Sequence, residues 1–265
     1  MLYTLKGLVL RENVAGDNAR YINLLTAERG RLSVLVRGSA KSRGKFTAPT
    51  QIFCYSEMVL YEHNGKYTLN DASLIENYFY LCSDFDTMTL GTYVLNAAEY
   101  VTSEEQPEEE ILRLTLNTLW ALSHRRERDL RLIKGAFELR LAALAGFAPN
   151  LVCCQGCGCG VGEDRLHLNV MEGTLLCEKC VDRFQKEVYM ENDILVDENR
   201  TAQIILPLDP AVVLAMQYAL YVQPNKLFSF TLAQELIPQF SHACEKYLEN
   251  HVDHHFQVLD MLTFS

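Results

Sequence analysis

The chain has 265 residues and a formal net charge of −10, with 49% hydrophobic and 22% charged residues. This composition indicates a globular protein with a sizeable core and argues against an intrinsically disordered chain. No run approaches the ~20 apolar residues of a membrane span, and the N-terminus lacks the pattern of a secretory signal, so we expect a cytoplasmic protein.

The charge is unevenly distributed along the chain. Residues 1–80 contain ten Lys or Arg and seven Asp or Glu, whereas residues 81–265 contain fourteen and twenty-seven. A polyanion responds to the local field within a Debye length of ~10 Å. The first part of the chain therefore remains a candidate for nucleic-acid binding although the protein as a whole is acidic.

The first 80 residues predict a small β domain. β-Prone runs cover residues 3–10, 20–26, 32–36, 53–62 and 67–69, and Asn64-Gly65 predicts a tight hairpin. Five short strands with glycine-containing turns indicate a small closed or sandwich sheet. An OB-type barrel and an SH3-like barrel both fit this strand count.

From Ser83 onward the apolar residues recur at helical spacing. Helices are predicted to begin at 83, 107 and 209 and to cover 126–145 and 231–251. The predicted architecture is an α+β multidomain protein, with a β domain over residues 1–80 and a helical domain over residues 81–265.

Two Cys-x-x-Cys pairs, 19 residues apart, predict a metal site: Cys154, Cys157, Cys177 and Cys180. Two tight turns of this kind complete a tetrahedral Cys₄ site for one structural Zn²⁺ within segment 150–182. Four thiolates leave no position for a reactive water, so we expect the metal to hold the fold. Cys153 and Cys159 are nearby, and whether either can replace a ligand stays open. A thiol redox pair is the weaker alternative.

A basic stretch without any acid, residues 31–45, is the second candidate site. Such a short, glycine-containing stretch can place cations along phosphates. The predicted DNA contacts are Arg20, Arg31, Arg37, Lys41, Arg43 and Lys45. An ordinary solvated loop is the alternative.

Two further charged groups are less specific. One basic cluster consists of Arg125, Arg128, Arg131 and Lys134, for which a salt-bridged helix face is the alternative. The histidines His242, His251, His254 and His255 are interpreted as a solvated helix end in preference to a metal site. No nucleotide-binding loop or catalytic triad pattern occurs, so we expect no enzymatic activity.

The stretch Gly146-Phe-Ala-Pro149, the two cysteine pairs, and Thr26-x-Glu28-x-Gly30-x-Leu32-Ser33 followed by Arg37-Gly38 resemble the RecO recombination-mediator family in its zinc-containing branch. The resemblance implies an N-terminal OB fold and a helical domain that holds zinc.

The resemblance also implies non-catalytic work in the RecF pathway of DNA repair. The expected partners are single- and double-stranded DNA, RecR, the C-terminal tail of single-strand-binding protein and, indirectly, RecA, with annealing of complementary strands. Residues 125–134 are the expected contact for the acidic tail. The alternative function is a zinc-ribbon adaptor that binds protein and not DNA.

Overall fold

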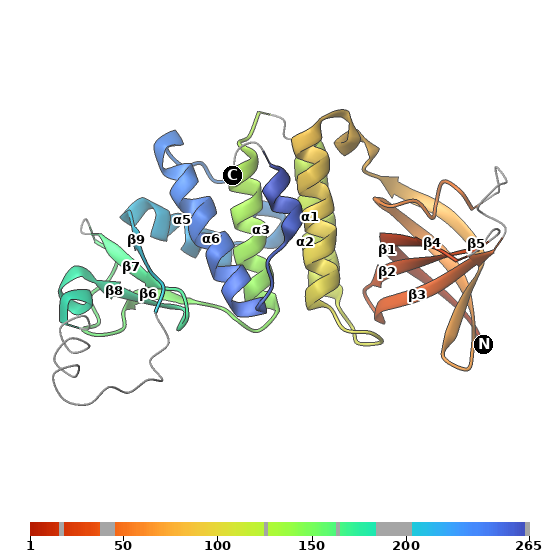
Figure 1. The fold of residues 1–265 in the computed structure, drawn as a ribbon, viewed down its shortest axis with the longest axis horizontal. Coiled ribbons are helices and arrows are strands. Elements are labelled where there is room, and N and C mark those ends of the chain that lie inside the picture. The colour runs from red at the N-terminus through yellow and green to blue at the C-terminus, as the bar shows by residue number, and fades with distance from the viewer. Residues whose placement is uncertain (16–18, 38–45, 125–126, 163–164, 184–202, 263–265) are drawn as a thin grey trace. The chain divides into compact units, whose positions relative to one another are not determined.

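The computed structural model describes residues 1–15, 19–37, 46–124, 127–162, 165–183 and 203–262 (Figure 1). The chain divides into two compact units. The first comprises residues 1–127 and 256–265, and the second comprises residues 128–255. The predicted boundary at residue 80 marks the change from strands to helices, but the first unit also includes the two helices that follow.

A closed five-stranded sheet forms the start of the first unit (Figure 1). Its order is β1-β2-β3-β5-β4, with strands β1 (Leu2–Val14), β2 (Ala19–Thr26), β3 (Gly30–Arg37), β4 (Cys54–His63) and β5 (Lys66–Asn77). All neighbours are antiparallel except β3 and β5, which pair in parallel at Val34–Tyr67 and Leu35–Thr68. The predicted small closed sheet is confirmed, whereas its OB type stays a prediction.

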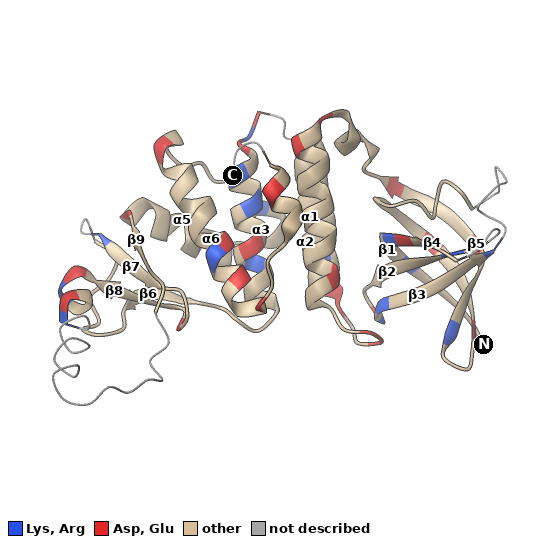
Figure 2. Cartoon of the chain, in the orientation of Figure 1, with Lys and Arg blue, Asp and Glu red and all other residues tan. Residues whose placement is uncertain are grey.

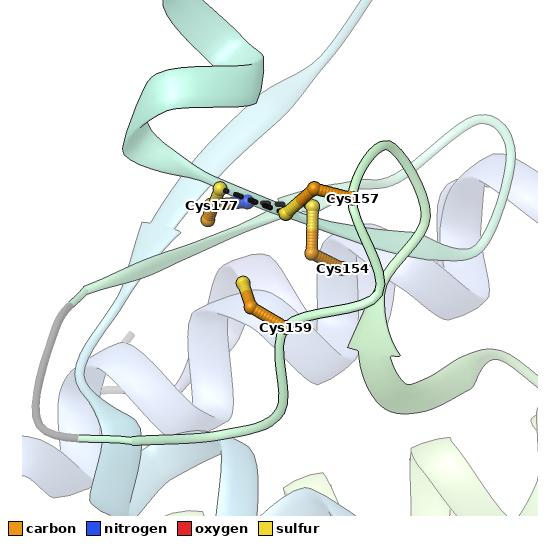
Figure 3. Close-up of side chains that lie close together, drawn as sticks. All are labelled: Cys154, Cys157, Cys159 and Cys177. Carbon is orange, nitrogen blue, oxygen red and sulfur yellow. Dashed lines mark hydrogen bonds between the residues drawn. The ribbon is translucent and has the colours of Figure 1, made fainter.

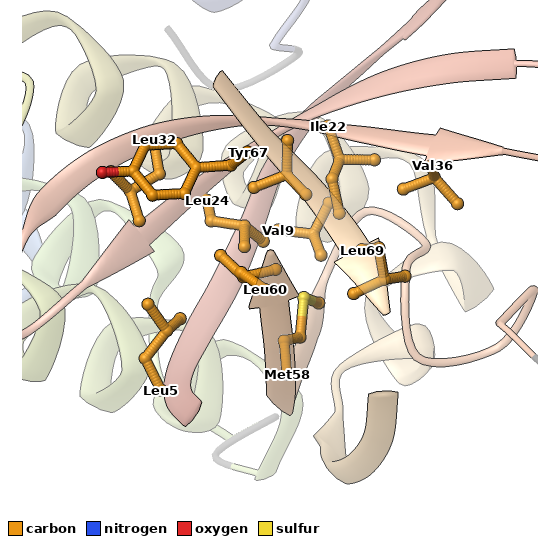
Figure 4. Close-up of a cluster of buried hydrophobic side chains, with 11 residues drawn as sticks. Leu5, Val9, Ile22, Leu24, Leu32, Val36, Met58, Leu60, Tyr67 and Leu69 are labelled. Carbon is orange, nitrogen blue, oxygen red and sulfur yellow. The ribbon is translucent and has the colours of Figure 1, made fainter. Parts of the chain in front are cut away.

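The interior of this barrel is filled by alternate residues of all five strands (Figure 4). On β3, for example, Leu32, Val34 and Val36 are buried, while Ser33 and Arg37 are exposed. The full cluster is Leu5, Val9, Ile22, Leu24, Leu32, Val34, Val36, Met58, Leu60, Tyr67 and Leu69. Each fully buried side chain of this size contributes roughly 1.5–3 kcal/mol relative to an exposed one.

The predicted hairpin at Asn64-Gly65 is present. Both residues have positive φ, 51° and 71°, and the flanking residues His63 and Lys66 pair directly. A two-residue turn of this kind matches the right-handed twist of the strands, and Asn-Gly is its preferred sequence.

Two helices, α1 (Phe85–Val101) and α2 (Glu109–His124), complete most of the first unit. Asp84 caps α1 by accepting a hydrogen bond from the Thr87 N–H at 3.0 Å. The acidic connection between the helices docks on the β2–β3 turn, because the Arg31 N–H donates to Ser103 O at 3.0 Å and the Glu108 N–H donates to Ala27 O at 2.9 Å. The 3-10 helices η1 (Phe79–Ser83) and η4 (Gln257–Met261) pack on α1.

Among its described residues, the second unit combines three long helices and the short helical stretch 178–183 with a small sheet. The helices are α3 (Leu130–Leu144), α5 (Pro210–Tyr221) and α6 (Ile237–Val252). The sheet has the order β6-β8-β7-β9, with strands β6 (Asn150–Cys154), β7 (Leu166–Asn169), β8 (Thr174–Cys177) and β9 (Ile205–Leu208). Two 3-10 turns, η2 (Pro224–Lys226) and η3 (Gln234–Leu236), precede α6.

Helix boundaries differ most from the prediction at two places, whereas α1 and α2 each begin two residues later than predicted. Asp129 caps α3, so this helix begins at 130 and not at 126. The last helix begins at Ile237 instead of 231, with Pro238 in its first turn. Proline has no N–H to donate, and its ring clashes with the carbonyl four residues earlier in a helix. It is therefore tolerated in a first turn, and the helix does not extend farther upstream of Pro238.

Candidate metal centre and nucleic-acid interface

Four cysteine sulfurs gather at the edge of the small sheet in the second unit. The Sγ atoms of Cys154, Cys157, Cys159 and Cys177 all lie within 4.8 Å of one another (Figure 3). Cys154 ends β6, Cys177 ends β8, and the other two lie on the turn that follows β6. The Cys157 and Cys177 sulfurs are 3.7 Å apart. A Zn–S bond of about 2.3 Å in a regular tetrahedron separates neighbouring sulfurs by ~3.8 Å, so this group could hold a metal ion.

The backbone around Cys154 favours a thiolate. Burial raises the pKa of this thiol, but hydrogen bonds from the N–H groups of Cys177, Cys157 and Gly156 outweigh that effect and lower the pKa to about 6. The Cys177 N–H lies 3.2 Å from Cys154 Sγ. A metal binds the thiolate form, so these donors prepare the sulfur for ligation.

Three of the four predicted ligands therefore meet, and Cys159 joins them. The fourth predicted ligand, Cys180, is buried and lies beside this group on the helical residues 178–183. Its thiol interacts with the sulfurs of Cys177, Cys154 and Cys157, which raises its pKa to about 12. Cys159 stands only two positions after Cys157, but Cys-x-x-Cys spacing favours Cys180 as the fourth ligand.

The outward side of β2 and β3 forms the candidate nucleic-acid interface. Tyr21, which is 41% exposed, pairs with Leu35, and Ala19 pairs with the exposed Arg37. Tyr21 and Arg37 are therefore diagonal neighbours on one solvent-facing side. We call Tyr21, Leu35 and Arg37 the β2–β3 outer face; farther along the same side, the part-buried Asn23 donates to Glu99 Oε1 at 2.6 Å. An exposed ring beside a cation suits a single strand, whose bases stack and whose phosphates pair with cations.

Comparisons with known proteins agree with this architecture. Residues 1–78 match the N-terminal domain of recombination protein O, and residues 82–196 match its C-terminal domain. The chain belongs to the recombination protein O family. The DNA repair protein RecO of Acetivibrio thermocellus is 26% identical over 256 residues, which cover 97% of this chain and 94% of that protein. The RecO of Symbiobacterium thermophilum is 30% identical over 185 residues, which cover 68% of this chain and 72% of that protein.

The residues predicted to bind DNA in this RecO-family chain do not all lie on the outer face. Lys41, Arg43 and Lys45 lie outside the described residues. Arg37 is exposed at the end of β3, and Arg31 is partly buried at the other end of the same strand, where its guanidinium donates to Glu99 O at 2.9 Å.

The position of Arg20 contradicts the expectation that it contacts DNA. Its side chain is only 9% exposed, and its guanidinium donates to Glu12 Oε1 at 2.5 Å and to the Thr50 hydroxyl. Thr50 in turn donates to Phe46 O. Arg20 thus fixes the chain at residues 46–50 from within the barrel and has no open face for a phosphate.

The predicted partner cluster is also dispersed. Arg125 lies outside the described residues, Arg128 donates to Phe230 O at 2.6 Å, and Arg131 pairs with Asp129 at 2.7 Å. Lys134 is 2% exposed and pairs with Glu138 and Glu245 at 2.9 Å and 2.5 Å. A buried ammonium with two carboxylates offers nothing to a partner, so the expectation that Lys134 belongs to an exposed surface is corrected.

Two of the C-terminal histidines make contacts close to them in the sequence. His251 Nδ1 lies 2.9 Å from Tyr247 O, and His255 Nδ1 lies 2.6 Å from Glu249. The connection from α1 to α2 is acidic in Figure 2. Within the part of the chain that the structure describes, no helix is both long and apolar enough to cross a bilayer.

Proposed function

We propose that this protein is a non-catalytic mediator of DNA repair and recombination. It binds single- and double-stranded DNA, anneals complementary strands and, with RecR, helps RecA to load on DNA coated by single-strand-binding protein. It acts in the bacterial cytoplasm, at the nucleoid. Membership of the recombination protein O family supports this role, and the β2–β3 outer face is the structural observation that carries it.

The DNA path follows from that face. Tyr21 stacks on a base, Arg37 binds a phosphate, and the basic residues that follow Arg37 in the sequence, up to Lys45, continue the track. The order β1-β2-β3-β5-β4, with β3 parallel to β5, supports an OB-type barrel. Because these contacts are to backbone and ring faces, binding is insensitive to sequence.

The zinc has a structural role in this proposal. Cys154, Cys157 and Cys177 hold one Zn²⁺ together with a fourth thiolate, and the ion ties the turn after β6 to the end of β8. A closed thiolate set fits Zn²⁺ and leaves no open coordination position. The tail of single-strand-binding protein, which is acidic, is assigned to the surface around Arg128 and Arg131, without Lys134.

A salt titration tests the DNA assignment. The test variant changes Arg37, Lys41, Arg43 and Lys45 to Ala, and its affinity for a fluorescent single strand is measured by anisotropy at several salt concentrations. The slope of log K against log[salt] falls by roughly 0.7 for each phosphate that the variant no longer neutralises. The control removes four exposed cations elsewhere, Arg113, Arg165, Arg183 and Lys226. Equal slopes for the two variants place the DNA on another surface.

Tyr21→Ala separates stacking from charge in the same assay. Loss of one stacked base weakens binding by about 1–3 kcal/mol and leaves the salt slope unchanged, because every phosphate keeps its cation. Unchanged affinity for Tyr21→Ala refutes the role of the ring.

A protein-binding adaptor is the second candidate. Residues 67–112 contain no Lys or Arg, and Tyr80 and Phe85 are 71% and 49% exposed there. A wild-type protein without measurable DNA affinity at low salt favours this function.

A further inference from the structure

Five cysteines lie in or beside the metal centre, one more than a tetrahedral ion can use. Cys154, Cys157 and Cys177 belong both to the close group of sulfurs and to the two Cys-x-x-Cys pairs. Cys159 lies within 4.8 Å of all three and directs its sulfur toward them in Figure 3. Cys180 is not part of that mutual group, but its sulfur lies against the turn of the first pair, 2.8 Å from where a Cβ on Gly156 would be. Zinc in a structural site takes four ligands, so one of these two thiols is left over.

Backbone hydrogen bonds hold Cys159 at the site without help from a metal. The Cys154 N–H donates to Cys159 O at 2.8 Å, and the Gly158 N–H donates to Cys154 O at 2.8 Å. The next residues outward, Cys153 and Gly160, form an antiparallel bridge. The chain therefore closes on itself after the first pair, helped by the positive φ of 76° at Gly158. This closure returns Cys159 to the side of Cys154.

Cys180 contacts this turn at Gly156. A Cβ atom placed on Gly156 would lie 2.8 Å from Cys180 Sγ and 3.9 Å from Cys154 Sγ. Glycine at 156 thus leaves the space that the Cys180 sulfur occupies against the turn. The two candidates differ in access to solvent, because Cys180 is 7% exposed whereas Cys159 is exposed.

We propose that Cys159 and Cys180 alternate as the fourth zinc ligand, so that the metal-loaded protein always keeps one spare thiol, which is accessible to modification at Cys159. The inference rests on the zinc site of the proposed function. In the exchange, one Zn–S bond forms as another breaks. The incoming thiol gives up its proton and the departing thiolate takes one up, so the exchange releases no net proton and needs no oxidant.

Cobalt spectroscopy of single and double variants tests this proposal. Co²⁺ replaces Zn²⁺ in the full-length protein, and the intensity of its thiolate charge-transfer absorption reports the number of bound sulfurs. We expect four sulfurs in the wild type, in Cys159→Ser and in Cys180→Ser, and three in the double variant. Cys153→Ser is the matched control, because this neighbour lies outside the cluster. Circular dichroism confirms folding of each variant.

The other outcomes overturn the inference in distinct ways. Three sulfurs in Cys180→Ser with four in Cys159→Ser make Cys180 a fixed ligand and Cys159 a bystander, and the reverse result fixes Cys159. Four sulfurs in the double variant place the fourth ligand elsewhere. A wild type that binds neither Zn²⁺ nor Co²⁺ instead refutes the metal site itself.

Alkylation of the unaltered protein gives an independent measurement. Iodoacetamide forms an S–C bond with a free thiol as iodide leaves and the thiol proton passes to solvent. In the zinc-loaded wild type, peptide mapping should find Cys159 modified while the zinc content stays at about one per chain and Cys157 stays protected. Protection of Cys159 equal to that of Cys157 contradicts the exchange.

Discussion

The buried charges between α3 and α6 allow a quantitative test of the second unit. Lys134 and Glu138 lie one turn apart on α3, and their side chains are 3% and 0% exposed. Glu245 of α6 is 23% exposed and completes the group. Burial alone would lower the pKa of Lys134, but the adjacent carboxylates of Glu138 and Glu245 raise it above its ordinary value. The ammonium is therefore charged when the protein is folded.

Lys134→Met removes the cation while keeping an unbranched side chain of similar length. The fully buried Glu138 carboxylate then loses the ammonium that pairs with it at 2.9 Å, and breaking a buried pair in this way costs about 3–5 kcal/mol. That cost is a large part of the roughly 5–15 kcal/mol that stabilises a domain. Replacing both residues, as in Lys134→Met with Glu138→Met, removes both buried charges together and should restore most of the stability.

Urea unfolding followed by circular dichroism measures these differences, with the m-value as a check that the same structure unfolds. Lys246→Met is the control, because this side chain is 40% exposed and pairs with Glu249 at 3.0 Å. Its ammonium stays open to solvent and Glu249 keeps His255 at 2.6 Å, so this pair should contribute about 1 kcal/mol or less. The reasoning fails if Lys134→Met costs no more than the control, or if the double variant is no more stable than Lys134→Met.

Three further changes test other parts of the structure. Cys157→Ser should lose bound zinc, as measured by elemental analysis, and should lower the unfolding temperature, whereas Cys153→Ser keeps both. At Gly30 a Cβ would lie 2.1 Å from Gln106 O, so Gly30→Ala should cost about 2–4 kcal/mol from strain and overpacking together. Gly65→Ala meets no atom within 4 Å and should cost about 1 kcal/mol from its positive φ alone; equal costs in chemical unfolding would contradict the proposed close approach. The side chain of Arg131 lowers the pKa of Asp129, so the stability from this carboxylate is present above its unfolded pKa of about 3.9 and is lost as the pH falls through the folded value. Asp129→Asn should therefore flatten the acid side of the stability–pH curve, and a curve that matches the wild type would refute this assignment.

Strand and turn chemistry made the barrel predictable. Alternation of apolar residues identified β2 and β3, and Asn64-Gly65 located the hairpin between β4 and β5. These are local signals, and each one depends on residues within a few positions of one another. The closure of the sheet between β3 and β5 has no such local signal, because it joins Val34 to Tyr67 through only two residue pairs.

The cysteine site was predictable in part for the same reason. Two residues between cysteines bring both sulfurs to one ion, which placed Cys154 beside Cys157. Cys177 was assigned to the same ion because it begins the second pair, and the fold brings it there through the end of β8. The return of Cys159 depends on backbone hydrogen bonds across the turn after β6, including Cys154 N–H to Cys159 O. Spacing alone does not report such a closure, so Cys159 stayed an open question.

Arg20 and Lys134 show that a basic residue type does not by itself determine whether the side chain is exposed or buried. The basic neighbours of both residues predict surface cations, yet each is buried against an acidic side chain. For Arg20 the signal existed, since Arg20, Ile22 and Leu24 share one side of an alternating strand and the latter two are core residues. For Lys134 the sequence contained part of the signal, since Lys134 and Glu138 stand at i and i+4 on a helix whose neighbours Ile133 and Phe137 are buried. The sequence did not reveal the second partner, Glu245, which lies more than a hundred residues away on α6. A buried ammonium becomes favourable only when the fold brings a second carboxylate to it.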